Sequence, residues 1–151
     1  MKEKNFKILL VEDNKHDIEL TLRAFQKNNL IDKVFIVKDG EEALNFIFGR
    51  GDYQDLNIEK GPKLILLDLK LPKVSGLEVL KQIKLNKRTK RIPVVILSSS
   101  REDSDIHNAL DFGANSYIVK PLKFDKLVTA IRDINNYWFD LNENIISGPN
   151  N

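Results

Sequence analysis

The sequence predicts an α/β protein with a parallel sheet of five strands covered by helices on both faces. Five short apolar runs with little polar alternation recur along the 151 residues, and such runs are typical of strands buried on both faces. Segments with apolar residues at helical spacing separate them. Strands and helices that alternate in this way form a three-layer sandwich, and right-handed crossovers place all strand carboxyl ends along one edge.

Each expected strand is bounded by polar residues or proline. Residues 64–67 are continuously apolar, Asp68 ends that run, and Pro72 cannot continue a strand ladder. Pro93 introduces the fourth strand in the same way. The expected strands are residues 7–11, 34–37, 64–67, 94–97 and 117–119.

The expected helices combine apolar faces with recognisable ends. Asp39 precedes Glu42, and Ser75 precedes Glu78, at the capping-box spacing. Gly113 is the expected C-terminal cap of the fourth helix. The apolar faces are Ile18, Leu22 and Phe25; Ala43, Leu44 and Ile47; Leu77, Leu80 and Ile83; Ile106, Ala109 and Leu110; and Leu127, Val128, Ile131 and Ile134.

Length and composition restrict the possible functions. A chain of this size forms one domain and needs no disulfide or metal to hold a core. The absence of cysteine excludes disulfide frameworks, thiol catalysis and Cys-ligated metal sites, and two histidines, His16 and His107, are too few for a His cluster. The start lacks the apolar core of a signal peptide and no run reaches membrane-spanning length, so we expect a cytoplasmic protein without membrane contact.

The balance of charges gives no strong indication of a charged partner, although the basic run could contact phosphate. The formal net charge is +2, and the one basic run, residues 81–91, contains no aromatic residue. Residues 52–61 are polar and non-periodic. We interpret the basic run as the solvated end of a helix and the polar stretch as an exposed loop.

Side chains capable of chemistry stand at the ends of four of the five expected strands. They are Glu12 and Asp13, then Asp68, Ser98 and Lys120. The shared edge brings them to one crevice. Carboxylates held close together raise each other's pKa unless a cation compensates, so the cluster predicts a bound divalent ion. Oxygen ligands favour Mg2+, with Mn2+ as the alternative.

Asp68 is the expected nucleophile, because it sits between the acid pair and the pair formed by Ser98 and Lys120. A carboxylate can attack a phosphoryl group and form an aspartyl phosphate. Phosphoryl transfer requires mainly positioning and charge neutralisation, which a metal, an ammonium and a hydroxyl supply. No residue of the set is an evident base for activating water. The phosphorylated state should therefore persist, which suits a switch better than a turnover enzyme.

These motifs resemble the CheY-like receiver domain of two-component response regulators. The resemblance covers residues 6–135, with the motifs in the order and at the spacing of the family. It implies a flavodoxin-like strand order 2-1-3-4-5 with the site beside strands 1 and 3. The matching segments are residues 9–14, 66–72 with 75–76, 96–99 and 117–121.

The resemblance also implies the phosphorylation and metal chemistry of the site. It implies that a sensor histidine kinase phosphorylates Asp68, with Asp13, Asp68 and the main-chain carbonyl of Lys70 as magnesium ligands. Glu12 is then expected to act through water. Lys70 itself places a cation two residues after the phosphoacceptor, and we predict that it alters the dephosphorylation rate.

The resemblance further assigns the switch. Lys120 is expected to pair with the phosphoryl group, and Ser98, at a position that is often Thr, to donate its hydroxyl to it. Tyr117 is the aromatic residue that moves inward when Ser98 is drawn toward the phosphate. Ser99 and Pro121 lie nearby, and the Lys120–Pro121 bond is expected to be cis.

A closer resemblance is to the stand-alone regulators that partner bacterial phytochrome kinases. It rests on residues 48–53 with 61–62, on 69–73 and 91–95, and on the aromatic residues Tyr137, Trp138 and Phe139. A phytochrome-type kinase is therefore one candidate partner, while the downstream target stays open.

Residues 136–151 are expected to be an extension and not a separate domain. The three aromatic residues either pack back on the receiver domain or form a homodimer surface with the fourth and fifth helices. No DNA-binding domain is expected, so the output is binding to another protein, or a role as a phosphoryl shuttle or sink.

Two other function classes fit the same architecture. The first is a phosphohydrolase with Asp68 as covalent nucleophile, although Lys70 stands where such hydrolases commonly carry a second acid. The second is a nucleotide- or flavin-binding module. Its first strand–helix turn should be rich in glycine or hydroxyls to hold phosphate, whereas residues 12–16 read Glu-Asp-Asn-Lys-His.

Overall fold

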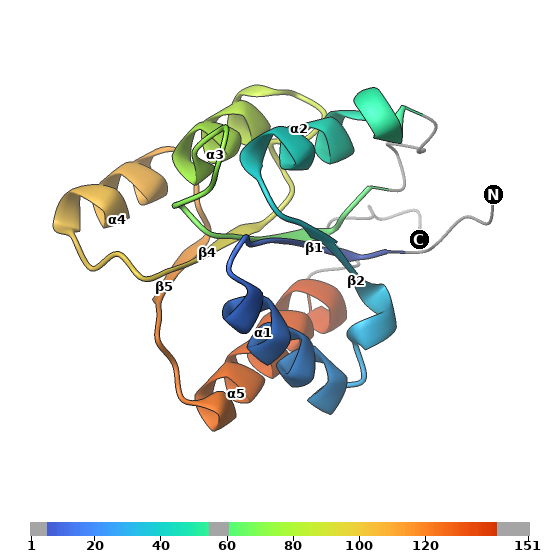
Figure 1. Cartoon of the computed structure of the whole chain (residues 1–151), viewed down its shortest axis with the longest axis vertical. Helices are drawn as coiled ribbons and strands as arrows, with labels where there is room; N and C mark the ends of the chain where they lie inside the picture. Colours follow the sequence, from blue (N-terminus) through green and yellow to red (C-terminus); the bar gives the residue numbers. More distant parts are fainter. Residues whose placement is uncertain (1–5, 55–60, 142–151) are drawn as a thin grey trace.

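The computed structural model of the chain describes residues 6–54 and 61–141 (Figure 1). Within them, five parallel strands form one sheet in the order β2-β1-β3-β4-β5, which confirms the expected strand order. The strands are β1 (Ile8–Val11), β2 (Val34–Val37), β3 (Leu64–Leu67), β4 (Val94–Ser98) and β5 (Ser116–Val119).

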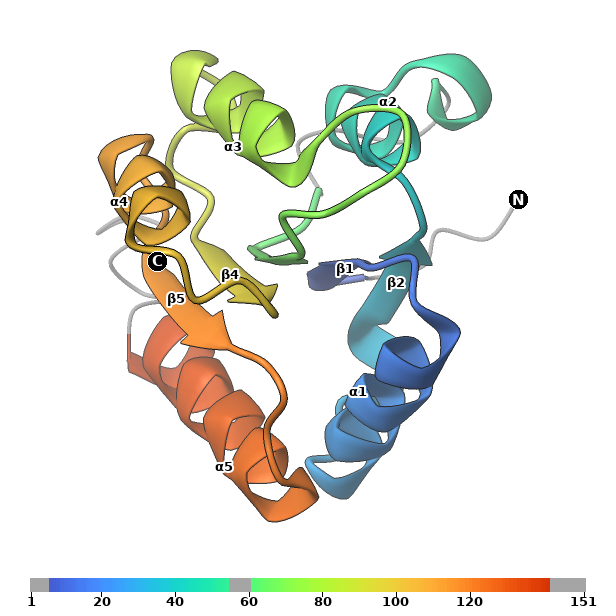
Figure 2. The same ribbon diagram turned by 60° about the vertical axis from the view of Figure 1, so that its left-hand side comes forward.

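Helices cover both faces of the sheet, as a three-layer sandwich requires. Figures 1 and 2 show α1 and α5 on one face and α2, α3 and α4 on the other. None of the helices in the described part of the chain has the length and apolar character needed to cross a membrane. The helices are α1 (Lys15–Lys27), α2 (Gly40–Phe48), α3 (Gly76–Leu85), α4 (Asp103–Asp111) and α5 (Phe124–Asn135), with the short 3-10 segments η1 (Ile31–Lys33) and η2 (Gly51–Tyr53) and a π-helical segment η4 (Asn136–Leu141).

Alternation along each strand divides the core into two layers. Successive strand residues point to opposite faces. In β1, Leu9 and Val11 therefore join the layer that contains α2 and α3, whereas Ile8 and Leu10 join the layer beneath α1 and α5. All four β1 side chains are buried, which explains why the run is apolar without polar alternation.

Helix ends follow the capping chemistry that the sequence predicts. The Asp39 side chain accepts a hydrogen bond from the Glu42 N–H at 2.7 Å, and Ser75 accepts one from Glu78 at 3.2 Å. Gly113 follows the last turn of α4 with φ of +106°, a conformation that side chains rarely adopt. Each cap satisfies backbone groups that have no partner within the helix.

Two local expectations need correction. Leu110 was expected to face inward but is 44% exposed, because α4 rests on the sheet through Ala109. The stretch expected to be an exposed loop begins with the 3-10 turn η2, and Tyr53 packs edge-on against Phe35 and Phe46. Residues 55–60 of that stretch lie outside the described residues.

The first residues of the aromatic extension continue α5. Trp138 packs against the core layer beneath α1 and α5, which is the first of the two expected arrangements. Tyr137 is 51% exposed and contacts the Trp138 ring edge-on, with 4.8 Å between ring centroids. The side chain of Phe139 and residues 142–151 lie outside the part that the structure describes.

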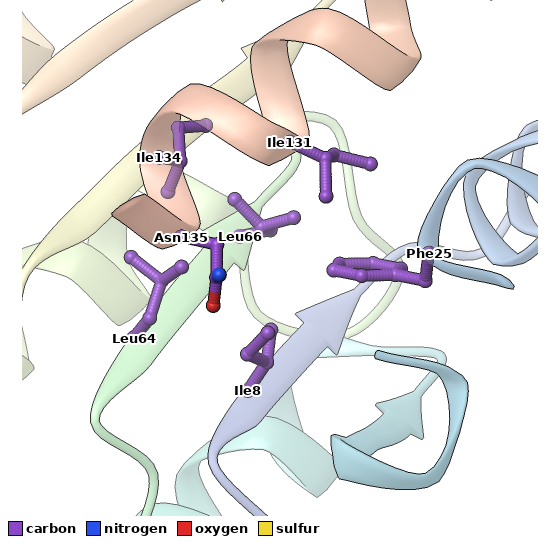
Figure 3. Close-up of a pocket in the computed structure, with 7 residues that line it drawn as sticks. All are labelled: Ile8, Phe25, Leu64, Leu66, Ile131, Ile134 and Asn135. Carbon is purple, nitrogen blue, oxygen red and sulfur yellow. The ribbon is translucent and has the colours of Figure 1, made fainter. Parts of the chain in front are cut away.

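A small apolar pocket lies between α5 and the amino-terminal ends of β1 and β3 (Figure 3). Asn135 is the one polar residue of its lining. The pocket is therefore at the end of the strands opposite Glu12 and Asp68, and its lining offers no acid, base or nucleophile. The lining residues are Ile8, Phe25, Leu64, Leu66, Ile131, Ile134 and Asn135.

Candidate functional site

The strand register brings acids from β1 and β3 side by side. Val11 is paired with Leu67, so the next residues, Glu12 and Asp68, are neighbours just beyond the strands. The Asp68 N–H donates to the Val11 carbonyl at 3.1 Å, which extends the ladder by one residue. Asp13 follows where the chain turns into α1. The parallel pairing alone therefore creates a local concentration of carboxylates.

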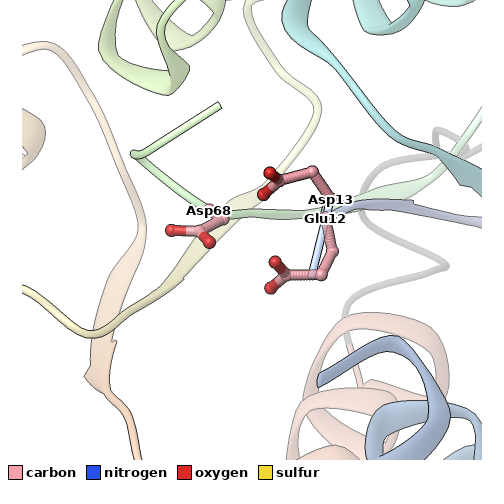
Figure 4. Close-up of side chains that lie close together, drawn as sticks. All are labelled: Glu12, Asp13 and Asp68. Carbon is pink, nitrogen blue, oxygen red and sulfur yellow. The ribbon is translucent and has the colours of Figure 1, made fainter. Parts of the chain in front are cut away.

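Three carboxylates meet at this edge of the sheet. Glu12, Asp13 and Asp68 each place one oxygen so that all three oxygens lie within 4.8 Å of one another. Figure 4 shows them facing a common space beyond the ends of β1 and β3. Glu12 and Asp68 are buried, whereas Asp13 is exposed. Carboxylates at such distances repel one another unless cations lie between them.

Lys120 supplies one such cation from the end of β5. Ser98 is paired with Val119, and the Lys120 N–H donates to the Ser98 carbonyl at 2.8 Å. Its ammonium donates to Glu12 Oε1 at 2.8 Å and to Asp68 Oδ2 at 3.4 Å. The side chains at the ends of β1, β3 and β5 therefore meet in one site, and Ser98 adjoins it through its backbone contact with Lys120.

Asp17 is a fourth carboxylate that reasoning from strand ends missed. It lies in the first turn of α1, and its Oδ2 accepts a hydrogen bond from the Lys120 ammonium at 2.8 Å. Its N–H donates to the capping side chain of Asn14 at 2.9 Å, which fixes its backbone. A sequence signal exists, because Asp17 is an acid in the first turn of the helix that directly follows Glu12 and Asp13.

For Glu12 and for Lys120, burial and ion pairing shift the pKa in opposite directions. Burial is the main cause that raises the pKa of Glu12, and the hydrogen bond from Lys120 only partly offsets it. For Lys120, burial by itself would lower the pKa, but hydrogen bonds to Asp17 and Glu12 outweigh it and raise the pKa above its ordinary value. Lys120 is therefore protonated at neutral pH.

One ammonium does not balance the acids around it. When ionised, the carboxylates of Glu12, Asp13, Asp17 and Asp68 carry four negative charges against one on Lys120. Closely spaced carboxylate oxygens are hard ligands of the kind that Mg2+ and Mn2+ prefer. The donor set therefore fits a divalent ion, which Glu12, Asp13 and Asp68 are placed to hold.

Ser98 and Tyr117, the expected switch residues, both contact Ser100. Ser98 is fully buried, and its Oγ accepts a hydrogen bond from the Ser100 N–H at 3.3 Å. The Tyr117 hydroxyl donates to the Ser100 carbonyl at 3.0 Å. Ser100 in turn donates its hydroxyl to Asp105 in α4. Reasoning from strand ends did not identify Ser100, whose position in this network depends on the path of the β4–α4 loop.

The remaining expected residues lie around the rim. The N–H of Lys70 donates to Asp68 Oδ1 at 3.3 Å, and its side chain is exposed, as is Ser99. The role of the Lys70 carbonyl as a ligand stays a prediction. The Lys120–Pro121 bond is cis, as the resemblance implied.

Comparison with known proteins gives one family. Residues 8–132 match the response regulator receiver domain. The probable methanogenesis regulatory protein FilR2 of Methanothrix harundinacea is 40% identical over 141 residues, which are 93% of this chain and 88% of FilR2.

Solved structures give the same result. The phosphorylated cyanobacterial phytochrome response regulator RcpA is 41% identical, with a TM-score of 0.79 over 89% of this chain and 94% of RcpA. The Mn2+-bound form of Rcp1 is 35% identical, with a TM-score of 0.79 over 90% of this chain and 96% of that chain. A response regulator Rcp1 from Synechocystis sp. is 36% identical over 133 residues, 88% of each sequence.

Proposed function

Because the chain belongs to the response regulator receiver domain family, we propose that it is a stand-alone response regulator that a sensor histidine kinase phosphorylates on Asp68 with Mg2+. The observation that carries this proposal is the position of the Asp68 carboxylate, grouped with Glu12 and Asp13 and 3.4 Å from the Lys120 ammonium. The chain spans 88% of FilR2 and 94% of RcpA, which supports a regulator that consists mainly of the receiver domain.

The proposed reaction is a single phosphoryl transfer. An Asp68 carboxylate oxygen attacks the phosphorus of a phosphohistidine; the new P–O bond forms as the P–N bond breaks, and the imidazole leaves with the electron pair and takes up a proton. Lys120 donates a hydrogen bond to a phosphoryl oxygen. Mg2+, when bound, neutralises charge on the phosphoryl oxygens. The chain thus accepts and loses one phosphoryl group and turns over no other substrate.

The proposed switch couples this reaction to the β4–α4 loop. The Ser98 hydroxyl donates to a phosphoryl oxygen and moves toward Asp68, which weakens the bond that Ser98 now accepts from the Ser100 N–H. Because the Tyr117 hydroxyl is held by the carbonyl of the same residue, the loop and the tyrosine respond together. Their rearrangement alters the surface that a partner protein binds.

The known proteins support the phosphorylation and metal parts of this proposal. RcpA has been solved phosphorylated, and Rcp1 has been solved with Mn2+. The similarity to a phytochrome response regulator supports a phytochrome-type kinase as partner, whereas FilR2 bears the name of a methanogenesis regulator. Phosphotransfer from a panel of purified kinases identifies the partner by its rate.

Intact mass spectrometry with acetyl phosphate and Mg2+ tests the function. We expect a single phosphoryl adduct on the wild type and on the exposed-site control Asp111→Asn, and none on Asp68→Asn. Phosphate release without an adduct would favour the phosphohydrolase. Neither adduct nor release would favour the nucleotide- or flavin-binding module.

We also propose that the chain forms a homodimer at the β5 edge of the sheet, where α4 and α5 flank this strand (Figure 2). Leu110 and Phe112 near the end of α4 are 44% and 38% exposed, and Tyr137 beyond α5 is 51% exposed. Exposed large apolar groups commonly anchor interfaces. Light scattering should show that the full chain is a dimer. A chain that ends at Asn135, and a chain that carries Leu110→Ser together with Tyr137→Ser, should both be monomers. Monomers in every case would contradict the proposal.

A further inference from the structure

The Lys120 ammonium is shared among three carboxylates, and Asp68 holds it least closely. Its distances to Glu12 Oε1 and Asp17 Oδ2 are both 2.8 Å, against 3.4 Å to Asp68 Oδ2. A lysine ammonium has three N–H donors, so these acceptors use all of them. To bind a phosphoryl group on Asp68 closely, the ammonium must move toward Asp68 and lengthen at least one of its shorter contacts.

The contact with Asp17 is the one that can lengthen at low cost. The side chain of Glu12 is 4% exposed and that of Asp17 is 32% exposed, so water can replace the ammonium only at Asp17. Glu12 is also held by the Asn14 N–H, which donates to its Oε2 at 3.1 Å. A buried carboxylate that loses its partner costs much more than an exposed one.

The backbone of Asp17 is fixed, so its carboxylate restrains the ammonium from a defined position. Its N–H donates to Asn14 Oδ1 at 2.9 Å, and its carbonyl accepts the Thr21 hydroxyl at 2.7 Å. Asp17 belongs to α1, whereas Asp68 lies at the end of β3. The ion pair therefore holds Lys120 toward the helix and away from the phosphoacceptor.

We propose that Asp17 is a positioning residue that restrains Lys120 before phosphorylation and thereby slows phosphoryl transfer to Asp68. This inference rests on the proposed function. In the unphosphorylated protein the restraint must be released to reach the transition state. In the phosphorylated protein Lys120 has already moved, so hydrolysis starts with the restraint released. Asp17 should consequently affect the rate of phosphorylation and leave the rate of dephosphorylation unchanged.

The test measures both rates in the full chain by intact mass spectrometry, with acetyl phosphate and Mg2+. Asp17→Asn and Asp17→Ala should become phosphorylated about two- to fivefold faster than the wild type, the range expected for a partly exposed ion pair. Their adducts should decay at the wild-type rate after the donor is removed. Asp17→Glu, which keeps the charge, should stay closer to the wild type than either variant.

Two controls separate this restraint from general repulsion of an anionic donor. Glu19→Gln removes a negative charge from an exposed position of the same helix and should change neither rate. In about 1 M salt, long-range repulsion of the donor is screened, whereas the 2.8 Å contact is only weakened, so part of the effect of Asp17→Asn should remain. Thermal unfolding of each variant verifies that it is folded.

The outcomes distinguish this inference from the proposed function. An adduct on the wild type with an unchanged or slower rate in Asp17→Asn overturns the inference and leaves the function standing. An acceleration that Glu19→Gln shares, or that high salt abolishes, also overturns it. Absence of an adduct on the wild type overturns the function and the inference together.

Discussion

Tyr53 joins the turn after α2 to the start of that helix through a charged hydrogen bond. Its hydroxyl donates to Glu42 Oε2 at 2.6 Å, while Glu42 Oε1 accepts the Lys38 N–H at 3.0 Å. Burial, and then the hydrogen bond to Glu42, raise the pKa of Tyr53. The folded state therefore keeps the phenol protonated at a pH where the unfolded chain has begun to release the proton.

This shift predicts how stability depends on pH. The contribution of Tyr53 is fully present below the unfolded pKa of about 10, and it is lost progressively as the pH rises from that value toward the raised pKa of the folded state, because over that range only the unfolded state loses the proton. Tyr53→Phe should lower the free energy of unfolding by about 1 kcal/mol at neutral pH and should flatten its decline above about pH 10. Urea unfolding across that range measures both, with Tyr137→Phe as the exposed control; equal slopes for wild type and Tyr53→Phe would contradict the prediction.

The geometry of parallel sheets determines which site residues the sequence could predict. Glu12, Asp68 and Lys120 directly follow strands, and parallel strands end at one edge, so chain order predicts that these residues share that edge. Asp17 and Ser100 act from a helix and a loop. Their places depend on how α1 and the β4–α4 loop are seated, which no local pattern encodes.

At the scale of elements, the start of α3 packs against the backbone of Asp68, the proposed phosphoacceptor. A Cβ added to Gly76 would overlap the Asp68 carbonyl oxygen and lie 2.6 Å from the Leu69 Cα. The Gly76 N–H also donates to the Leu69 carbonyl at 2.8 Å. The close approach of helix and loop therefore sets the position of the Asp68 backbone and requires glycine here.

Gly76→Ala should therefore impair phosphorylation as well as stability. Overpacking of this kind costs about 1–3 kcal/mol, and relief of the overlap must displace either α3 or the Asp68 backbone. Leu77→Ala, a half-buried position of the same helix, lowers stability without contacting Asp68. At a temperature where both variants are folded, we expect slower adduct formation in Gly76→Ala alone; equal rates would show that the contact does not position Asp68.

Helix ends were predictable where a residue nearby in the sequence caps them. The environment of a side chain was not predictable where it depends on contacts with residues far along the chain. Asp39 and Ser75 cap their helices within four residues, so their motifs are visible in the sequence. Lys84 was expected to be solvated with its basic neighbours, but burial lowers its pKa, and its ammonium donates to the carbonyls of Lys90 and Ile92. That correction depends on the path of the α3–β4 loop.

At the scale of the whole molecule, the sheet connects the proposed phosphorylation site to the edge formed by β5. Periodicity and chain order predicted the five strands and their common carboxyl edge, whereas the strand order came from the family resemblance. The described structure adds part of a route: Ser98 at the end of β4 and Tyr117 on β5 are linked through Ser100, and Asp68 follows β3, the strand next to β4. We propose that phosphorylation of Asp68 is transmitted along this route.

Amide hydrogen exchange of the phosphorylated and unphosphorylated full chain tests this claim most directly. Exchange reports local opening of backbone hydrogen bonds. We expect phosphorylation to change the protection of backbone amides from exchange at Ser100 and along β5 around Tyr117. The variant Ser98→Ala should still form the adduct on Asp68 but should no longer show that change. An adduct on Asp68 with unchanged exchange at both places would contradict the claim.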